Sequence, residues 1–143
     1  MVERVYKSSE KERAIRLCDE SFPRGLCKRD DYSEVFEKID KYADFFVAYE
    51  EGDVCGYAAM YNNDMSSKKA YITMIGVRDA FQRKHIGSKL MEACVKSASE
   101  NGMVAIRLEV LNSNTKAISF YKNKGFVYEK DCSEDSIYMV LEL

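Results

Sequence analysis

The apolar positions of this chain recur with two periods, one typical of helices and one typical of strands. Two groups in the first third follow helical spacing: Ile15, Cys18 and Phe22, then Tyr32, Val35, Phe36 and Ile39. Ser9-Glu10-Lys11-Glu12 has the pattern of a capping box for the first helix, and Asp31-Tyr32-Ser33-Glu34 is placed to cap the second. Pro23-Arg24-Gly25 is expected to separate the two helices.

Strand-like runs surround these predicted helices. Val2–Lys7 alternates weakly and predicts a first strand. After the second helix, a meander of three strands is predicted over Asp44–Glu50, Val54–Tyr61 and Ala70–Val77, with a turn at Glu51-Gly52-Asp53.

The second half of the chain alternates between helix and strand patterns. A helix is predicted from Ile86 to about Glu100, followed by a strand at Val104–Leu111. A short helix follows, capped by Ser113 or Asn114 and ended by Gly125. Its apolar face would be Ala117, Ile118 and Phe120, and Gly125–Lys130 would pair with Ser136–Glu142 as a closing hairpin. This order predicts an α+β fold, with residues 1–143 as a single domain.

Composition narrows the class of protein. The 143 residues are 46% hydrophobic and 32% charged, which indicates a globular domain with a substantial core. A net charge of −2 and a pI near 5.6 argue against a nucleic-acid partner. The longest apolar runs are too short to span a membrane, and the first residues lack the apolar core of a signal peptide. We therefore expect no membrane association.

The cysteine pattern indicates a reducing compartment. Five cysteines are scattered without a C-x-x-C pair, so a disulfide framework or a zinc site is not expected. A single histidine also argues against a metal centre. The expected location is the cytoplasm.

Two segments carry the candidate chemistry. The first, Val77–Leu90, runs from a strand-like stretch through a basic loop into a helix, whose N-terminus would offer free N–H groups to an anion. The second, Asn114–Phe126, is a helix that bears a tyrosine. Both segments resemble the GNAT superfamily of acyl-CoA-dependent N-acyltransferases, and the resemblance extends from about Phe45 to Phe126.

Individual positions carry this resemblance. The loop is similar to the family's Q/R-x-x-G-x-G/A signature, with Gln82 first and Gly87 last, and His85 stands where the family usually has its first glycine. In the later segment, Asn114, Ala117, Tyr121 and Gly125-Phe126 fall where the family has them. The resemblance implies a mixed, mostly antiparallel central sheet with helices on both faces.

The resemblance also implies a site for acetyl-CoA as co-substrate, without a metal. The strand Tyr71–Val77 would splay from its neighbour, leaving backbone groups of Ile75, Gly76 and Val77 to grip the pantetheine and the acetyl oxygen. The pyrophosphate would lie on the loop made by Gln82, Arg83, Lys84, His85, Ile86, Gly87 and Ser88, with Lys89 adding charge. Asn114, Ala117 and Tyr121 would complete the cofactor site. Alternatively, the cations are simply solvated.

Two catalytic roles follow from the same resemblance. Tyr121 would act as general acid toward the departing thiolate; alternatively it packs beside Phe120 as part of the core. Glu109 stands where the family's ribosomal-protein alanine acetyltransferases carry their base, although its alternation with Leu108 and Val110 also fits a salt bridge or solvation. Asp19 and Glu20 are weaker candidates for the base. His85 is not expected to transfer protons, because the pyrophosphate lies away from the thioester.

The sequence leaves the acceptor open. Residues from about Phe22 to Tyr42 and the hairpin at Asp131–Asp135 would frame the acceptor cleft. Acids in the first of these regions would suit a cationic acceptor or form a solvated surface: Asp30, Asp31, Glu34 and Glu37. The expected function is acetyl transfer from acetyl-CoA to a primary amine by direct attack on the thioester. The acceptor would be a small-molecule amine or a peptide N-terminus.

Other classes of function also remain open at this stage. One alternative is an acyl-CoA-sensing module that has lost catalysis, since the splayed strand carries no carboxylate at Ile72-Thr73-Met74. The other is an interaction domain with a fortuitous motif match. A homodimer is compatible with the resemblance.

Overall fold

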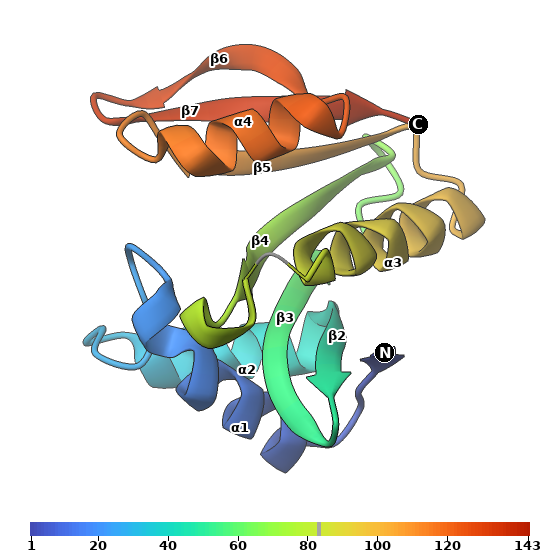
Figure 1. Cartoon of the computed structure of the whole chain (residues 1–143). Helices are drawn as coiled ribbons and strands as arrows, with labels where there is room; N and C mark the ends of the chain where they lie inside the picture. Colours follow the sequence, from blue (N-terminus) through green and yellow to red (C-terminus); the bar gives the residue numbers. More distant parts are fainter. Residues whose placement is uncertain (83) are drawn as a thin grey trace.

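The computed structural model of this chain describes residues 1–82 and 84–143. The described residues form one mixed sheet with helices packed on it (Figure 1). In chain order the elements are β1 (Val2–Arg4), α1 (Ser8–Cys18), the 3-10 turn η1 (Asp19–Ser21), α2 (Tyr32–Tyr42), β2 (Ala43–Glu50), β3 (Asp53–Tyr61), β4 (Lys69–Val77), the 3-10 turn η2 (Asp79–Phe81), α3 (Ile86–Glu100), β5 (Ala105–Leu111), α4 (Thr115–Asn123), β6 (Val127–Ser133) and β7 (Ser136–Glu142).

The sheet is mostly antiparallel, as the sequence predicted. Its strands lie in the order β1-β2-β3-β4-β5-β7-β6. Only β4 and β5 pair in parallel, and α3 is the crossover between them. The hairpin of β6 and β7 adds to the far side of β5 through β7. The α+β fold class is therefore confirmed.

Each face of the sheet has its own apolar core. On one face, α3 and α4 cover a cluster that includes Leu90, Cys94 and Ile106, all fully buried. On the other face, α1 and α2 cover a cluster that includes Ile15 and Tyr57. Alternate residues of β2 and β3 enter opposite clusters because successive side chains of a strand point to opposite faces. Helices therefore lie on both faces, as expected.

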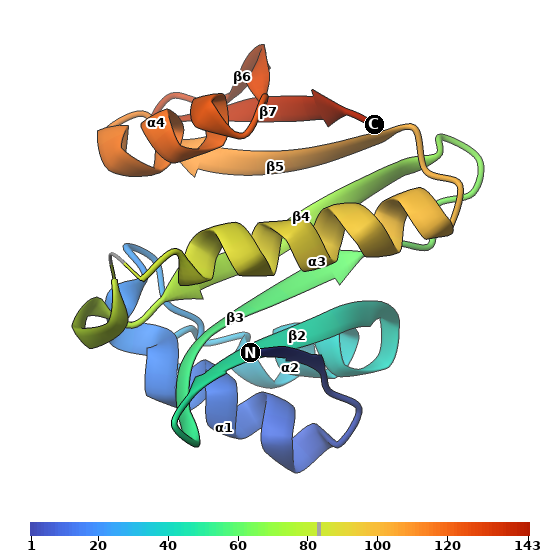
Figure 2. The ribbon, with the colours of Figure 1, turned by 45° about the vertical axis from the view of Figure 1, so that its right-hand side comes forward.

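The parallel pairing of β4 and β5 stops half-way along β4. The two strands are in register from Lys69 with Ala105 to Ile72 with Leu108, and no pair follows in the described residues. At this point the register with β3 also shifts, from Ile72 opposite Met60 to Met74 opposite Ala59, which leaves Thr73 as the extra residue of a bulge. Because a bulge bends its strand, β4 continues along β3 and leaves β5. Figure 2 shows the two strands diverging toward the N-terminal end of α3.

The helix starts differ from the sequence prediction. The predicted capping box is wrong, because α1 begins at Ser8 and its N-cap residue Lys7 makes no side-chain cap. Asp31 occupies the N-cap position of α2, but its side chain does not cap the helix and pairs with Arg29 instead. None of the helices in the described part of the chain combines the length and apolar character needed to cross a membrane.

Candidate active site

A cleft of about 1100 Å³ opens where β4 and β5 diverge. The ends of both strands, the loop into α3, the first turn of α3, α4 and the loop after η1 contribute to its walls. Most residues that the sequence predicted for the site line this cleft: Ile75, Gly76, Val77, Gln82, His85, Ile86, Gly87, Ser88, Glu109, Asn114, Ala117 and Tyr121. Segments that are far apart in the sequence therefore share one cavity.

The edge of β4 presents backbone groups to this cleft. The N–H of Arg78 donates to the carbonyl of Cys55 on β3 at 2.7 Å, whereas the carbonyl of Val77 accepts from Gln82 Nε2 at 3.3 Å. Backbone groups alternate in direction along an antiparallel pair. The N–H and C=O of Ile75 therefore point away from β3, as those of Val77 do, while Gly76 turns toward β3. Because β5 does not pair with this part of β4, the N–H and C=O of Ile75 and the N–H of Val77 are available to a ligand.

Gly76 allows an aromatic ring to close one end of the cleft. A Cβ atom at Gly76 would lie only 2.6 Å from the ring of Phe22. The Phe22 ring also packs against Tyr57, with 5.4 Å between ring centroids. Sequence analysis placed Phe22 on the inner face of the first helix, but that helix ends at Cys18. Phe22 follows η1 and lines the cleft instead.

The loop before α3 has the backbone geometry of an anion site. His85 is the N-cap residue of α3 and has a left-handed backbone, with φ +59° and ψ +22°. Glycine adopts this conformation without steric cost, which accounts for the glycine at this position in the resembled motif. The next residues, Ile86, Gly87 and Ser88, form the first turn, whose N–H groups have no partner within the helix. This turn therefore carries the partial positive charge of the helix into the cleft.

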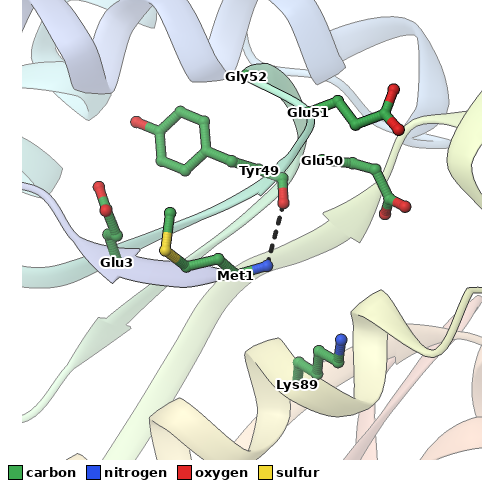
Figure 3. A pocket seen from close by; sticks show the side chains of 7 residues that line it. All are labelled: Met1, Glu3, Tyr49, Glu50, Glu51, Gly52 and Lys89. Atoms are coloured by element: carbon green, nitrogen blue, oxygen red, sulfur yellow. Dashed lines mark hydrogen bonds between the residues drawn. The ribbon is translucent and has the colours of Figure 1, made fainter.

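The basic residues predicted for this loop lie differently. Arg83 lies outside the described residues. Lys84 does not line the cleft, and its ammonium group lies 3.5 Å from the Glu50 carboxylate. Lys89 is a residue of a second hollow of about 650 Å³, where the amino group of Met1 donates to the Tyr49 carbonyl (Figure 3). Among the described lining residues, the lysines are Lys116 of α4 and Lys124 at the C-cap of that helix.

Tyr121 is the buried residue of α4. Its side chain is 9% exposed and lies between the rings of Phe120 and Phe126, at centroid distances of 5.6 and 5.7 Å. Burial, with a smaller effect of the Cys94 thiol, raises the pKa of Tyr121 to about 12. Phe120 packs against the same core, as the sequence predicted, but it is only partly buried and also lines the cleft. Tyr121 both packs in the core and lines the cleft, as a neutral phenol.

The helix that carries Tyr121 is fixed at its start by Asn114. The Oδ1 atom of Asn114 accepts a hydrogen bond from the N–H of Ala117 at 3.2 Å, so Asn114 rather than Ser113 is the cap. Asn114, Ala117 and Tyr121 follow one another at spacings of three and four residues. They therefore lie on one side of α4 and face the cleft together.

Glu109 enters the cleft from the opposite side of the sheet. Leu108 and Val110 are buried against α3 and α4, while Glu109 between them is exposed. Its Oε2 atom accepts a hydrogen bond from the buried hydroxyl of Ser136 at 2.6 Å. Burial, and then the Glu109 carboxylate, raises the pKa of Tyr71 to about 12. Glu109 is the one carboxylate among the described residues that line the cleft.

The end of the cleft where the sequence analysis placed the acceptor is more apolar than expected. Its lining includes Phe22, Leu26, Val35 and Met74. The four acids considered for a cationic acceptor, Asp30, Asp31, Glu34 and Glu37, are not among the described lining residues.

Two arginines line this end, and each of them has a carboxylate partner. Arg29 forms a two-point pair with Asp31, and Arg24 bridges to Asp135 in the β6–β7 turn. The second pair ties the loop after η1 to the closing hairpin across the mouth of the cleft.

Asp19, considered as a base, has a structural role in the described residues. Its carboxylate accepts hydrogen bonds from the backbone N–H of Leu26 at 2.7 Å and of Cys27 at 3.3 Å. A Cβ atom at Gly25 would lie 2.6 Å from the same carboxylate, so the loop wraps closely around it. Neither Asp19 nor Glu20 lines the cleft.

Comparison with known proteins identifies the family. A sequence model of the acetyltransferase (GNAT) family matches residues 10–126, which include every described residue that lines the cleft. The chain belongs to the GNAT acetyltransferase family.

Sequence relatives of this GNAT chain include N-alpha-acetyltransferases. N-alpha-acetyltransferase 60 of Xenopus tropicalis is 35% identical over 80 residues, which is 54% of this chain and 31% of the relative. An N-alpha-acetyltransferase of Sulfurisphaera tokodaii is 33% identical over 101 residues, which is 63% of this chain and 60% of the relative. The chain thus spans less than two thirds of the relatives it matches.

Solved structures share the fold. One of them, described as a streptothricin acetyltransferase of Bacillus anthracis, was solved in complex with acetyl coenzyme A. It is 27% identical to this GNAT chain with a TM-score of 0.67, over 75% of this chain and 66% of that one.

The backbone at His85 leads to a first prediction. His85→Gly should stabilise the fold by about 0.5 kcal/mol, because relief of left-handed strain exceeds the entropic cost of glycine. It should also bind coenzyme A as tightly as the parent or more tightly at pH 5.5 and pH 8, because the loop no longer carries a ring beside the anion. Denaturant unfolding and calorimetric titration measure both effects.

His85→Asn serves as the control, since asparagine tolerates the left-handed backbone but does not gain a charge. Weaker binding by both variants would mean that the ring of His85 holds the anion.

Proposed function

We propose that this GNAT chain transfers the acetyl group of acetyl-CoA to a primary amine by direct attack on the thioester. One observation carries the proposal: the gap between β4 and β5 joins the two faces of the sheet. The α3 N-terminus and Tyr121 belong to one face, and Glu109 belongs to the other. A thioester entering from the first face and an amine entering from the second would meet at the strand edge.

The described residues fit an acyl-CoA. The first turn of α3 suits a pyrophosphate, and the backbone groups of Ile75 and Val77 suit the amides of an extended pantetheine. The acetyl-CoA complex of the similar Bacillus anthracis enzyme supports this use of the cleft. When bound, acetyl-CoA supplies an already activated acyl group. The protein therefore has to orient the amine, accept its proton and stabilise the departing sulfur.

Tyr121 is proposed as the hydrogen-bond donor to the departing thiolate. With its pKa raised to about 12, it remains a neutral phenol over the physiological range. Full proton transfer to a thiolate is uphill, because an ordinary thiol titrates near 8.5. A hydrogen bond that strengthens as charge develops on sulfur still lowers the barrier.

Glu109 is proposed as the base for the acceptor amine. An ordinary primary amine is mostly protonated at neutral pH, so a nearby carboxylate can take up its proton, directly or through water. The hydroxyl of Ser136 holds one oxygen of Glu109, which fixes the orientation of the carboxylate and leaves the other oxygen for the amine.

A peptide or protein N-terminus is the acceptor that the observations favour. Both reported sequence relatives carry the name N-alpha-acetyltransferase. The acceptor end of the cleft is apolar, and its two arginines are paired with carboxylates. Glu109 is the one carboxylate among its described residues. This lining suits an acceptor with a single amine beside an apolar side chain. A polyamine or an aminoglycoside would require several carboxylates. A small amine with an apolar group is the second candidate.

The decisive experiment is a turnover screen that measures thiol release from acetyl-CoA. The panel contains short peptides with free N-termini, the same peptides with blocked N-termini, and polyamines. We expect turnover with free peptide N-termini and little with the blocked peptides or the polyamines. Binding of acetyl-CoA without turnover on any amine would favour the sensing-module alternative. Turnover with polyamines alone would contradict the acceptor assignment.

Tyr121→Phe should lower turnover by roughly 10- to 1000-fold without weakening acetyl-CoA binding, because it removes one proton donor. The parent should keep its turnover up to about pH 10, because the phenol stays protonated there. Because phenylalanine keeps the ring, the variant retains the aromatic contacts with Phe120 and Phe126, and the loss reports on the hydroxyl group alone. Equal turnover of Tyr121→Phe and the parent would exclude the acid role.

A further inference from the structure

Two residues of α4 and its C-cap residue form a stripe that faces the start of α3. Lys116, Phe120 and Lys124 follow at intervals of four residues and all line the cleft. Residues at this spacing lie on one side of a helix. The Phe120 ring would lie 3.4 Å from a Cβ atom at Gly87, in the first turn of α3. The middle of the stripe therefore lies against the first turn of α3.

Both lysines of the stripe are held close to this position. The Nζ atom of Lys116 donates to Gln82 Oε1 at 2.6 Å. The Nζ atom of Lys124 lies 5.6 Å from the centre of the Phe120 ring. In the described part of the chain, neither lysine has a carboxylate within 4.0 Å, whereas Lys84 pairs with Glu50. Two positive charges thus lie beside the partial positive charge of the α3 N-terminus, without a described carboxylate that balances them.

The side chain of Gln82 links the ammonium group of Lys116 to the backbone of β4. Its Nε2 atom donates to the Val77 carbonyl at 3.3 Å and to Asp79 Oδ1 at 3.2 Å, which fixes the amide group. Its Oε1 atom remains for Lys116. The bridge from Gln82 to Lys116 spans the cleft from the η2 side to α4. A phosphate oxygen is a stronger partner for an ammonium group than a neutral amide oxygen, so a bound phosphate would displace the amide.

We propose that Lys116 and Lys124 form the cationic wall of the phosphate subsite, and that the Gln82–Lys116 bridge closes this subsite until a phosphate replaces the amide. The inference rests on the proposed function, because it concerns the phosphates of coenzyme A. In this proposal the positive side chains of the subsite are Lys116 and Lys124, whereas the sequence analysis assigned that role to Lys84 and Lys89.

Calorimetric titration of coenzyme A against single variants tests the proposal. Lys116→Gln and Lys124→Gln should each weaken binding by about 10-fold at low salt, since each removes a charge-assisted contact. The matched control is Lys122→Gln. Lys122 lies on the same helix, is exposed and is not among the lining residues, so its removal should leave binding unchanged. Unfolding curves of all three variants show whether each is folded.

Shortened forms of coenzyme A show which phosphate each lysine contacts. Acetyl-pantetheine lacks the phosphates, so the parent and the Lys116 and Lys124 variants should bind it equally well. With 3′-dephospho-coenzyme A, a persisting loss assigns the lysine to the pyrophosphate, and a vanished loss assigns it to the 3′-phosphate.

Three outcomes separate the hypotheses. If the parent binds no coenzyme A, the proposed function fails and this inference fails with it. If the parent binds coenzyme A but Lys116→Gln and Lys124→Gln bind it as Lys122→Gln does, the cationic wall is excluded while the proposed function stands. A loss that appears equally with acetyl-pantetheine would also exclude a phosphate contact.

Discussion

The site depends on the point where β4 stops pairing with β5. A strand in the middle of a sheet normally satisfies its backbone on both edges, and buried groups without partners are costly. Here the bulge at Thr73 turns β4 along β3, and the edge that faced β5 becomes the wall of a cleft. The backbone of Ile75 and Val77 is thereby left to a ligand. Everything else in the candidate site is arranged around this gap.

The gap also separates two chemical tasks. The side of the sheet covered by α3 and α4 carries the features that suit an anionic cofactor: a helix N-terminus, the left-handed His85 and the lysines of α4. The other side carries a carboxylate, apolar side chains and paired arginines. Tyr121 reaches the boundary from a buried position that keeps its phenol protonated. In the proposed function, the two substrates would approach from opposite faces of the sheet and meet at the strand edge.

The fold was largely predictable because its elements have strong local patterns. The bounds of α3, Ile86–Glu100, follow from helical periodicity, and the strands follow from apolar runs ended by turns. The site was predictable where a motif carries it. The bulge at Thr73, the ring of Phe22 on Gly76 and the partner of Glu109 were not, because each depends on residues distant in sequence. Lys84 and Lys89 lie near the motif in sequence but do not line the cleft, because proximity in sequence does not place a flexible side chain.

Amide hydrogen exchange of β4 tests the central claim most directly. The N–H of Ile75 faces the gap left by β5, and the neighbouring N–H of Gly76 pairs with β3 and serves as an internal control. We predict that saturating acetyl-CoA slows exchange at Ile75 by about 10-fold or more while Gly76 changes little, because only Ile75 gains a partner. Unchanged exchange at Ile75 in protein saturated with acetyl-CoA would show that the cofactor does not bind along the splayed strand.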